Sequence, residues 1–356
     1  MRNRPMTRYF VLLIFLFFIL ITSMLVSLSI GAVDIPPSQI LFILTHPRTA
    51  SNEIRTANQA SGTTHTSAVI LLQLRLPRVL TAVLVGACLS LAGAIFQGLL
   101  RNPLAEPFIL GVSSGAALGV TFGMFLALPV ALGLYTVPLF ASLGAALAMA
   151  VVYRLACIGA RLSVFNLIIS GVIVNAVASA LIMFMVSIME RELHGVLFWL
   201  MGRLDTTTMG TLRILTIAVA VVFSAAIYFS RDLNLLTLGE EDAFHLGVNV
   251  ERVKRLLFFA GSILTGCAVA AGGIVGFVGL IVPHGARALV GPDNRFLFPA
   301  SMLLGAILMV TADIAARTAS SPSEIPVGVI TALLGGPFFL VVLKRKSGLV
   351  WSGRRD

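Results

Sequence analysis

The chain has 356 residues, of which 58% are hydrophobic and 11% are charged, and its mean hydropathy is +1.00. Soluble domains are about half apolar and about a quarter charged. This composition therefore excludes a soluble enzyme or a soluble binding module. It predicts an all-α integral membrane protein, because a helix satisfies its own backbone hydrogen bonds inside lipid.

Ten segments are apolar enough to cross a hydrocarbon core of about 30 Å, which takes about 20 helical residues. They are residues 9–31, 70–99, 113–130, 136–156, 164–188, 211–229, 255–272, 274–289, 297–316 and 325–343. The first segment is longer than the apolar core of a secretory leader and is followed by a poor cleavage site, so we expect a retained span. The sequence thus predicts about ten transmembrane helices.

The seventh and eighth segments form a nearly continuous apolar stretch from Leu256 to Val290. This stretch is too long for one helix, and it is interrupted by Gly272-Gly273 and by Pro283-His284. It predicts either two short elements or one span followed by a half-helix. Broken helices inside a membrane are tolerated where protein or a cavity covers the backbone, which favours a transport protein.

The positive charges indicate the orientation of the spans. With the N-terminus in the cytoplasm, 17 of the 25 lysines and arginines fall on the cytoplasmic side, as the positive-inside rule requires. We therefore expect both termini in the cytoplasm. The net charge of +10 is then explained by topology rather than by binding to nucleic acid.

Two segments share a glycine spacing that indicates a weak inverted repeat. Gly86–Gly93 and Gly266–Gly273 each begin and end with glycine, and the spans that carry them are predicted to run in opposite directions. Inverted repeats are common in transporters. Close packing of membrane helices also selects small residues, so the glycines alone leave both explanations open.

The sequence offers no metal centre. Cys88, Cys157 and Cys267 lie in or beside apolar runs without CxxC spacing, so we expect neither disulfides nor metal ligation. His284 is expected to pack and donate hydrogen bonds within a helix, and His194 to lie at the membrane interface.

Five long motifs stand in an order that resembles one family. They are LRLPRVLTAVLVGA, QGLLRNPLAEPFILGVSSGAALG, LGEEDAFHLGV, GGIVGFVGLIVPHGAR and SEIPVGVITALLGGPFF. From about residue 20 to residue 343, the chain resembles the permease subunits of the ABC importers for ferric siderophores, haem and cobalamin. The resemblance implies a ten-helix permease in a bacterial or archaeal cytoplasmic (inner) membrane.

The resemblance also implies partners. Residues 1–356 would form a single transmembrane permease domain that pairs with a second copy, favoured as a homodimer, or with a close homologue. Two cytoplasmic ATPase subunits would drive it, and a periplasmic or lipid-anchored binding protein would deliver the substrate. Independently, none of Lys254, Lys344 and Lys346 lies in a GxxxxGK[ST] loop, so ATP and magnesium would bind the partner ATPases and this chain would hold no cofactor.

The resemblance places the contact with the ATPases in a coupling loop at about residues 231–255. Family positions are matched by Gly239, Glu240, Ala243, Leu246 and Gly247. Glu240, Ala243 and Leu246 are spaced by three, which on a helix would give one small face able to enter a groove on a partner. A solvated acidic loop is the alternative, but an apolar leucine favours burial against another protein.

A cytoplasmic gate is implied at two turns. One contains Asn102 and Leu104, and the other, after the fourth span, contains Val164 and Phe165. In cobalamin permeases of this family we would expect small hydroxyl residues at the second turn. The apolar pair here predicts a more hydrophobic constriction.

The outer side carries an unexpected arginine pair. Arg75 and Arg78 flank Pro77 at the start of the second span, and Arg317 ends the ninth span on the same side. The i and i+3 spacing of Arg75 and Arg78 predicts that they share one face of a helix. The resemblance implies that these three arginines receive acidic residues of the binding protein. Snorkelling to lipid phosphates is the alternative.

The predicted function is passage of an iron chelate, either a siderophore or haem. Cobalamin import by the same mechanism is an alternative. A secondary transporter driven by ions would need acids or histidines within several spans. Only Asp313 fits that description, and its spacing from Arg317 predicts a helix-stabilising ion pair instead.

Overall fold

The computed structural model describes residues 6–31, 34–46, 67–126, 136–159, 161–189, 193–204, 208–320 and 323–351. Its helices in the first half are α1 (Met6–Ser29), α2 (Pro37–Thr45), α5 (Leu76–Leu99), α6 (Val112–Phe125), α8 (Thr136–Ala156), α9 (Val164–Ile188) and α10 (Leu193–Leu200). Those in the second half are α11 (Met209–Tyr228), α12 (Ser230–Leu236), α13 (Glu240–His245), α14 (Val250–Gly272), α15 (Val278–Val290), α16 (Asn294–Thr318) and α17 (Val327–Trp351). A π-helical turn, η1 (Ile70–Arg75), leads into α5, and a 3₁₀ turn, η2 (Pro107–Leu110), precedes α6. A hairpin of β1 (Cys157–Ile158) and β2 (Arg161–Leu162) joins α8 to α9.

The predicted spans correspond to helices. Among the described residues, seven helices are long and apolar enough to cross a membrane, and α6, α15 and the apolar part of α17 are shorter. Every one of the ten predicted segments overlaps one of these helices, although residues 127–130 of the third segment lie outside the described residues. The expected all-α membrane fold with about ten helices is therefore confirmed.

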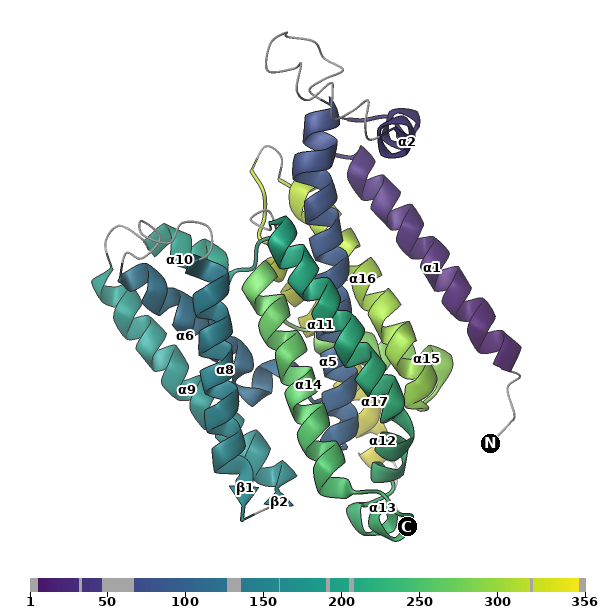
Figure 1. Cartoon of the computed structure of the whole chain (residues 1–356), viewed down its shortest axis with the longest axis vertical. Helices are drawn as coiled ribbons and strands as arrows, with labels where there is room; N and C mark the ends of the chain where they lie inside the picture. The colour runs from purple at the N-terminus through teal and green to yellow at the C-terminus, as the bar shows by residue number, and fades with distance from the viewer. Residues whose placement is uncertain are drawn as a thin grey trace.

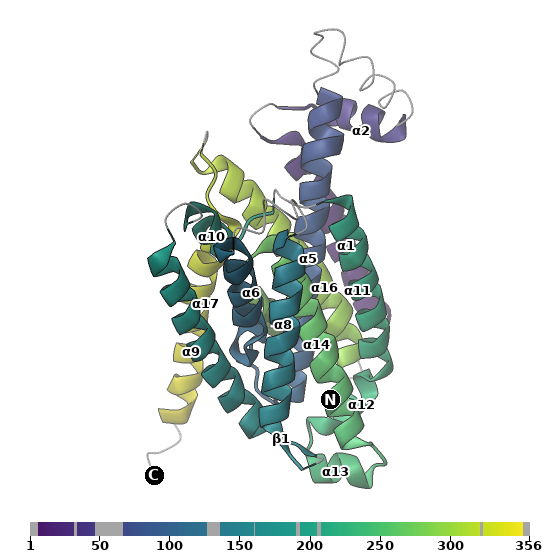
Figure 2. The ribbon, with the colours of Figure 1, turned by 60° about the vertical axis from the view of Figure 1, so that its left-hand side comes forward.

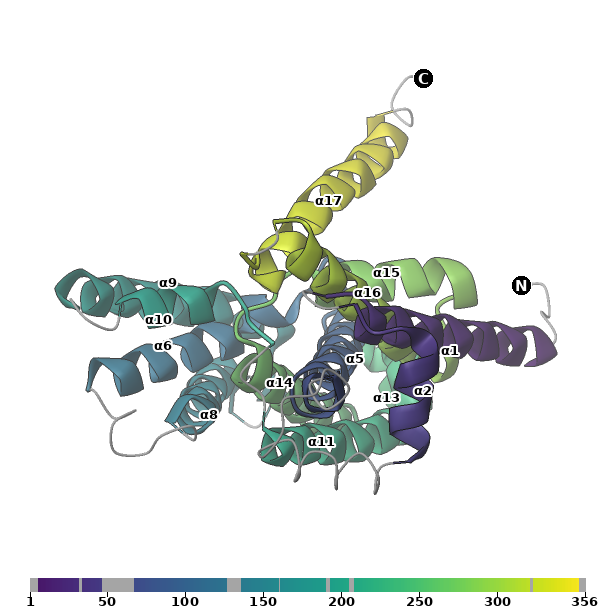
Figure 3. The same ribbon diagram turned by 90° about the horizontal axis from the view of Figure 1, so that it is seen from above.

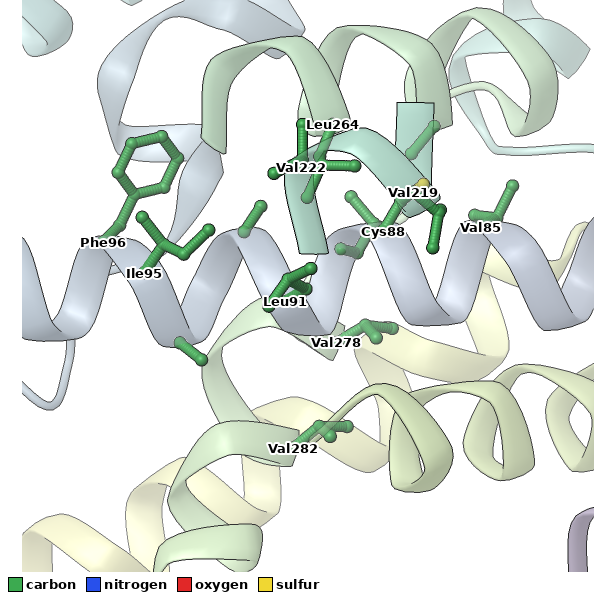
Figure 4. Packing of buried hydrophobic residues seen from close by; sticks show 14 of the residues in the cluster. Val85, Cys88, Leu91, Ile95, Phe96, Val219, Val222, Leu264, Val278 and Val282 are labelled. Carbon is green, nitrogen blue, oxygen red and sulfur yellow. The ribbon is translucent and has the colours of Figure 1, made fainter. Parts of the chain in front are cut away.

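Helix α5 forms the centre of the larger half of the bundle (Figure 1). In the span that includes it, Ser67–Leu99, 83% of the residues in an apolar 18-residue window are buried, compared with 22% in α1 and in α9. Its side chains interdigitate with α11, α14 and α15, as the cluster around Cys88, Leu91 and Phe96 illustrates (Figure 4). A helix that is apolar on all sides can be buried on all sides, which explains its central place.

Glycines bring neighbouring helices into close approach around α5. A Cβ atom on Gly86 would lie 2.2 Å from the carbonyl oxygen of Gly305 in α16, and one on Gly93 would lie 1.9 Å from that of Gly279 in α15. Neither position could hold a larger side chain without moving a backbone. Small residues at helix contacts are the usual means of packing in membranes, where no hydrophobic effect drives helices together.

Helices α6, α8, α9 and α10 form a second group beside the α5-centred bundle (Figures 1 and 3). Gly115 and Gly119 of α6 pack against the backbone of α8 at Gly144 and Phe140. Across the two halves, α5 packs on α15 and α16, while α14 packs on α6 and α8. The weak inverted repeat that the glycine spacing indicates stays a prediction.

The stretch from residue 256 to residue 290 is one full span followed by a half-helix, the second of the two predicted arrangements. Helix α14 has 23 residues, whereas α15 has 13, which at about 1.5 Å per residue gives only about 20 Å. The break follows Gly272, and Gly273 has a φ of +68°, a left-handed conformation that favours glycine. A half-helix needs partners for its free N–H groups inside the membrane.

The two ends of the bundle differ in their elements. Helices α2 and α10 lie at one end, and α13 and the β-hairpin lie at the other (Figures 1 and 2). Helix α1 starts at the α13 end, and α17 extends toward it. We call these the outer and the inner end, following the orientation that the charge distribution predicts. Helix α17 also projects away from the bundle (Figure 3), and Leu333 and Leu340 on it are each 67% exposed.

Candidate functional site

Helix α13 lies at the inner end, between two glycines with positive φ. The φ angles of Gly239 and Gly247 are 152° and 86°, and these turns set a six-residue helix across the end of the bundle. Ala243 is fully buried against its own chain, whereas Phe244 and Leu246 are 68% and 61% exposed. The expected shared face of Ala243 and Leu246 is therefore absent: the alanine anchors α13, and the leucine faces outward.

Glu240 of α13 is turned toward its own chain. Its Oε2 accepts a hydrogen bond of 3.0 Å from Lys254 Nζ in α14, and its Oε1 lies 3.8 Å from a guanidinium nitrogen of Arg101. Arg101 begins the loop that contains Asn102 and Leu104. Glu240 thus links α13 to α14 and to the first predicted gate turn, rather than presenting a free carboxylate.

The first gate turn is held by its own asparagine. The side-chain Oδ1 of Asn102 accepts a hydrogen bond of 2.9 Å from the backbone N–H of Leu104, and the backbone oxygen of Asn102 accepts one of 3.0 Å from Ala105. Asn102 and Leu104 are both half-buried. This geometry is an Asx turn, which lets the chain reverse after α5 where Pro103 prevents further helix.

The second gate turn follows the β-hairpin. Ser163 caps α9 by accepting a hydrogen bond of 3.3 Å from the backbone N–H of Asn166. Val164 and Phe165 are therefore the first residues of the helix, and Phe165 is 72% exposed. The apolar surface expected at this turn is present, on a segment that the cap and the hairpin hold in place.

At the outer end, Arg75 and Arg78 diverge. Arg75 is buried, and its guanidinium donates to the carbonyl oxygens of Leu28 and Ser29 at 2.8 and 3.2 Å. These are the last two residues of α1, whose terminal carbonyls have no partner within the helix. Arg75 therefore caps α1, a role that a guanidinium performs well at the negative end of a helix dipole.

Arg78 belongs instead to an ion-pair network with two acids. Its Nε lies 2.8 Å from Asp313, and its Nη1 lies 2.9 Å from Glu324. Asp313 also pairs with Arg317 at 3.1 Å, so the predicted i, i+4 pair in α16 is confirmed. Arg317 in turn donates to the carbonyl oxygens of Ser27 and Ile30, near the C-terminus of α1.

The three outer arginines thus bind acceptors of their own chain, and they join α1, α5, α16 and the segment before α17. Glu324 is the most exposed member of this network, with 49% of its side chain accessible, compared with 15% for Arg78 and 8% for Arg317. These contacts leave the predicted docking of a binding protein untested.

A half-buried acid, Glu106, holds the backbone just before the half-helix α15. Glu106 Oε1 accepts a hydrogen bond of 2.5 Å from the backbone N–H of Phe277, the residue before α15. Phe277 has a φ of +69°, and it packs against Gly335 of α17. The sequence around Glu106 does not predict this contact, because Phe277 lies in a distant motif.

The described residues contain no group of three or more histidine, cysteine or acidic side chains placed to hold a metal ion. The ring of His284 lies edge-on to that of Phe338 at 6.1 Å, as a packing residue would. The three cysteines are free thiols.

Comparison with known proteins decides the family. Residues 19–345 match the FecCD transport family. The chain belongs to this family. The FecCD chain is accordingly a non-catalytic permease subunit of an ABC importer and a multi-pass membrane protein.

Individual relatives cover most of the FecCD chain. It is 42% identical over 283 residues to the cobalamin import permease BtuC of Halobacterium salinarum, which covers 80% of this chain and 75% of that one. It is 41% identical over 280 residues to the hemin permease HmuU of Yersinia pestis, covering 78% and 84%. A solved metal-chelate type ABC transporter in an inward-facing conformation shares the fold, with a TM-score of 0.78, 33% identity and coverage of 94% and 99%.

Proposed function

We propose that this permease forms the translocation pathway for an iron chelate, either a siderophore or haem. A binding protein would deliver the chelate, and separate ATPase subunits would drive its passage. FecCD membership decides against a secondary transporter driven by ions. The names of the relatives leave the cargo open among haem, ferric citrate, cobalamin and molybdate, and their similar identities do not separate these cargoes.

The observation that supports an iron chelate is the apolar surface at the start of α9. Phe165 exposes 72% of its surface there, beside Val164, where the family resemblance leads us to expect hydroxyl side chains in a cobalamin permease. Hydrophobic constrictions close a pathway by excluding water. Such a constriction suits a bulky chelate with apolar surface better than a small oxyanion such as molybdate.

The proposed assembly follows the expected one. A second copy of the chain would complete the pathway, and one ATPase subunit would bind each α13. Leu238, Phe244 and Leu246 are each more than 60% exposed at the inner end, where no lipid core covers them in the predicted orientation. Exposed apolar patches of this kind mark protein interaction sites.

We also propose that Arg75, Arg78 and Arg317 together define the docking area of the binding protein. Arg75 would act indirectly, by fixing α1. Arg78 and Arg317 would supply the positive charge, with Arg78 exchanging half-exposed Glu324 for a carboxylate of the binding protein. Complementary charges of this kind mainly steer the encounter and set its register.

Uptake measurements test the cargo. The permease is reconstituted in liposomes with its ATPase subunits and binding protein, and ATP-dependent accumulation is compared for a ferric siderophore, haemin, cyanocobalamin and molybdate. We expect accumulation of a siderophore or of haemin. Accumulation of cyanocobalamin alone would establish the alternative, and accumulation of molybdate alone would refute both.

Substitution of Leu246 tests the ATPase contact. Leu246→Asp places a charge in the proposed apolar interface and should abolish copurification of the ATPase subunits, whereas Leu246→Met keeps the surface apolar and should retain them. Because Leu246 is exposed, neither substitution should alter the melting temperature of the isolated permease by much. Normal copurification with Leu246→Asp would exclude this surface as the contact.

A further inference from the structure

Lys254 is a buried ammonium group at the inner end that the function described so far does not use. Its side chain is 4% exposed, although it lies in a helix whose neighbouring Arg252 and Arg255 are exposed. Its Nζ lies 2.7 Å from the carbonyl oxygen of Leu162, 3.0 Å from Glu240 Oε2 and 2.8 Å from Glu251 Oε1. These three acceptors match the three protons of an ammonium group.

The acceptors come from three different elements. Glu240 is the first residue of α13, Glu251 lies on α14, and Leu162 ends the β-hairpin, two residues before Val164. Glu251 also accepts a hydrogen bond of 2.7 Å from the backbone N–H of Leu162. The carbonyl and the N–H of Leu162 are thus both held by this cluster, immediately before the start of α9.

The space around these contacts is hollow. A cavity of about 360 Å³ lies between α13, α14 and the hairpin; its lining is Ile158, Arg161, Leu162, Ser163, Val164, Glu240, Glu251 and Lys254. Across this space the polar contacts of Lys254 join Glu240 of α13 to Leu162 of the hairpin. The cavity also leaves room for the hairpin to shift.

We propose that Lys254 is a positioning residue that transmits displacement of α13 to the start of α9, where Val164 and Phe165 lie. The inference rests on the proposed function, in which the ATPases move α13. When Glu240 moves with α13, the buried ammonium must keep its acceptors, because leaving one of them unpaired is costly. Leu162 therefore follows, and the first turn of α9 follows Leu162.

Hydrogen exchange on the permease bound to its ATPase subunits tests this transmission. The exchange of peptides covering residues 157–168 and 238–248 is compared without nucleotide and with Mg·ATP plus orthovanadate. Coupling between sites is typically 5- to 150-fold, so in the wild type we expect nucleotide to change the exchange of residues 157–168 by about fivefold or more. In Lys254→Met the ratio of the exchange rates of residues 157–168 with and without nucleotide should fall to about one, while residues 238–248 still respond to nucleotide.

Two further variants serve as references. Arg252→Met removes a cation from the exposed face of the same helix and should respond as the wild type does. Lys254→Arg keeps the charge and its donors and should retain part of the response. A purely structural role for Lys254 would alter exchange equally with and without nucleotide, and so would leave the ratio unchanged.

The double variant Lys254→Met with Glu251→Gln covers the case in which Lys254→Met fails to fold. Lys254→Met alone would leave the Glu251 carboxylate without its cation, and Glu251→Gln removes that charge. The glutamine can still accept a hydrogen bond from the N–H of Leu162. A wild-type response to nucleotide at residues 157–168 in either folded variant would overturn the proposal. If wild-type α13 itself does not respond to nucleotide, the proposed ATPase contact fails instead.

Discussion

The charged clusters at the two ends of the bundle are built with opposite signs. At the outer end the buried group is an acid, Asp313, which is 1% exposed between the cations Arg78 and Arg317. At the inner end the buried group is a cation, Lys254, which is 4% exposed between Glu240 and Glu251. Each buried charge therefore lies between two charges of the opposite sign, and in the outer cluster a second acid, Glu324, is the most exposed member.

This difference fits what each end is proposed to bind. In the outer cluster Arg78 is paired with half-exposed Glu324, so an acidic side chain of a binding protein would have to replace Glu324 to reach the guanidinium. The inner cluster presents carboxylates, and Glu241 and Asp242 add two more in the first turn of α13. The outer cluster also joins the ends of long spans, whereas the inner one joins a six-residue helix and a two-stranded hairpin. We infer that the outer cluster is a fixed brace and the inner one can move.

The largest effect should come from removing the buried acid. Asp313→Ala leaves Arg317 without its ion pair and Arg78 with Glu324 alone. Breaking a buried pair in this way costs about 3–5 kcal/mol, so we expect a clear fall in the melting temperature of the detergent-solubilised permease, measured at one scan rate. Glu241→Ala, at an exposed acid of α13, should lie within about 0.5 kcal/mol of the wild type. Equal melting temperatures for Asp313→Ala and Glu241→Ala would show that the outer cluster does not stabilise the fold.

A smaller effect is expected from the cap on α1. Arg75→Met removes two hydrogen bonds to the terminal carbonyls of this helix, and a hydrogen bond that involves a charged group contributes about 1.5–3 kcal/mol. Hydrogen exchange at the C-terminal turn of α1 should accelerate, and the melting temperature should fall less than in Asp313→Ala. Arg213→Met, at an exposed arginine near the start of α11, is the matched control.

Gly31 gives an independent test of the same contact. A Cβ atom at this position would lie 2.4 Å from the Arg75 guanidinium, so Gly31→Ala should displace the arginine and reproduce the exchange change of Arg75→Met. Unchanged exchange in both variants would mean that α1 is held by its apolar contacts alone.

The smallest effect on stability is expected from the half-exposed ion pair of Arg78 and Glu324. Glu324→Gln weakens one contact of Arg78, and because the acid is half-exposed the loss of stability should be at most about 1 kcal/mol. The same substitution removes the acid that would compete with a binding protein for Arg78. We therefore expect affinity for the binding protein to rise by up to about fivefold at low ionic strength, with less gain at high salt. Weaker binding would indicate that Glu324 itself contacts the binding protein.

The sequence predicted the spans well because each span carries its own signal. The ranges 136–156 and 164–188 coincide with α8 and α9, since a run of apolar residues bounded by polar turns is a local property. The break after Gly272 was also readable, because glycine and proline act on their own backbone. The turn at Phe165 was indicated by the family resemblance, and the identity of the side chain then predicted its apolar surface.

Beyond the local pair of Asp313 and Arg317, the clusters could not be derived in this way, because most of their contacts join residues far apart in the chain. Spacing of i and i+3 suggested that Arg75 and Arg78 share a face. In the structure a π-helical turn ends at Arg75, Arg75 caps α1, and Arg78 pairs with Asp313. The same rule grouped Ala243 with Leu246, although burial separates them. Glu106 gave no local signal of Phe277, and Lys254 gave none of Leu162 or Glu240, because these partners come from other segments. Only Glu251, three residues before Lys254, is a local partner.

The sequence by itself determined that this protein is a helical permease with about ten spans, where its helices break, and to which family it belongs. These properties depend on hydropathy and on motifs that are contiguous in the chain. Only the tertiary structure decided which charges are buried, which acids face them, and how α13 is joined to the start of α9. A buried charge needs counter-ions or hydrogen-bond partners. Here several of them, such as Glu240 for Lys254 and Asp313 for Arg78, come from segments that only folding brings together.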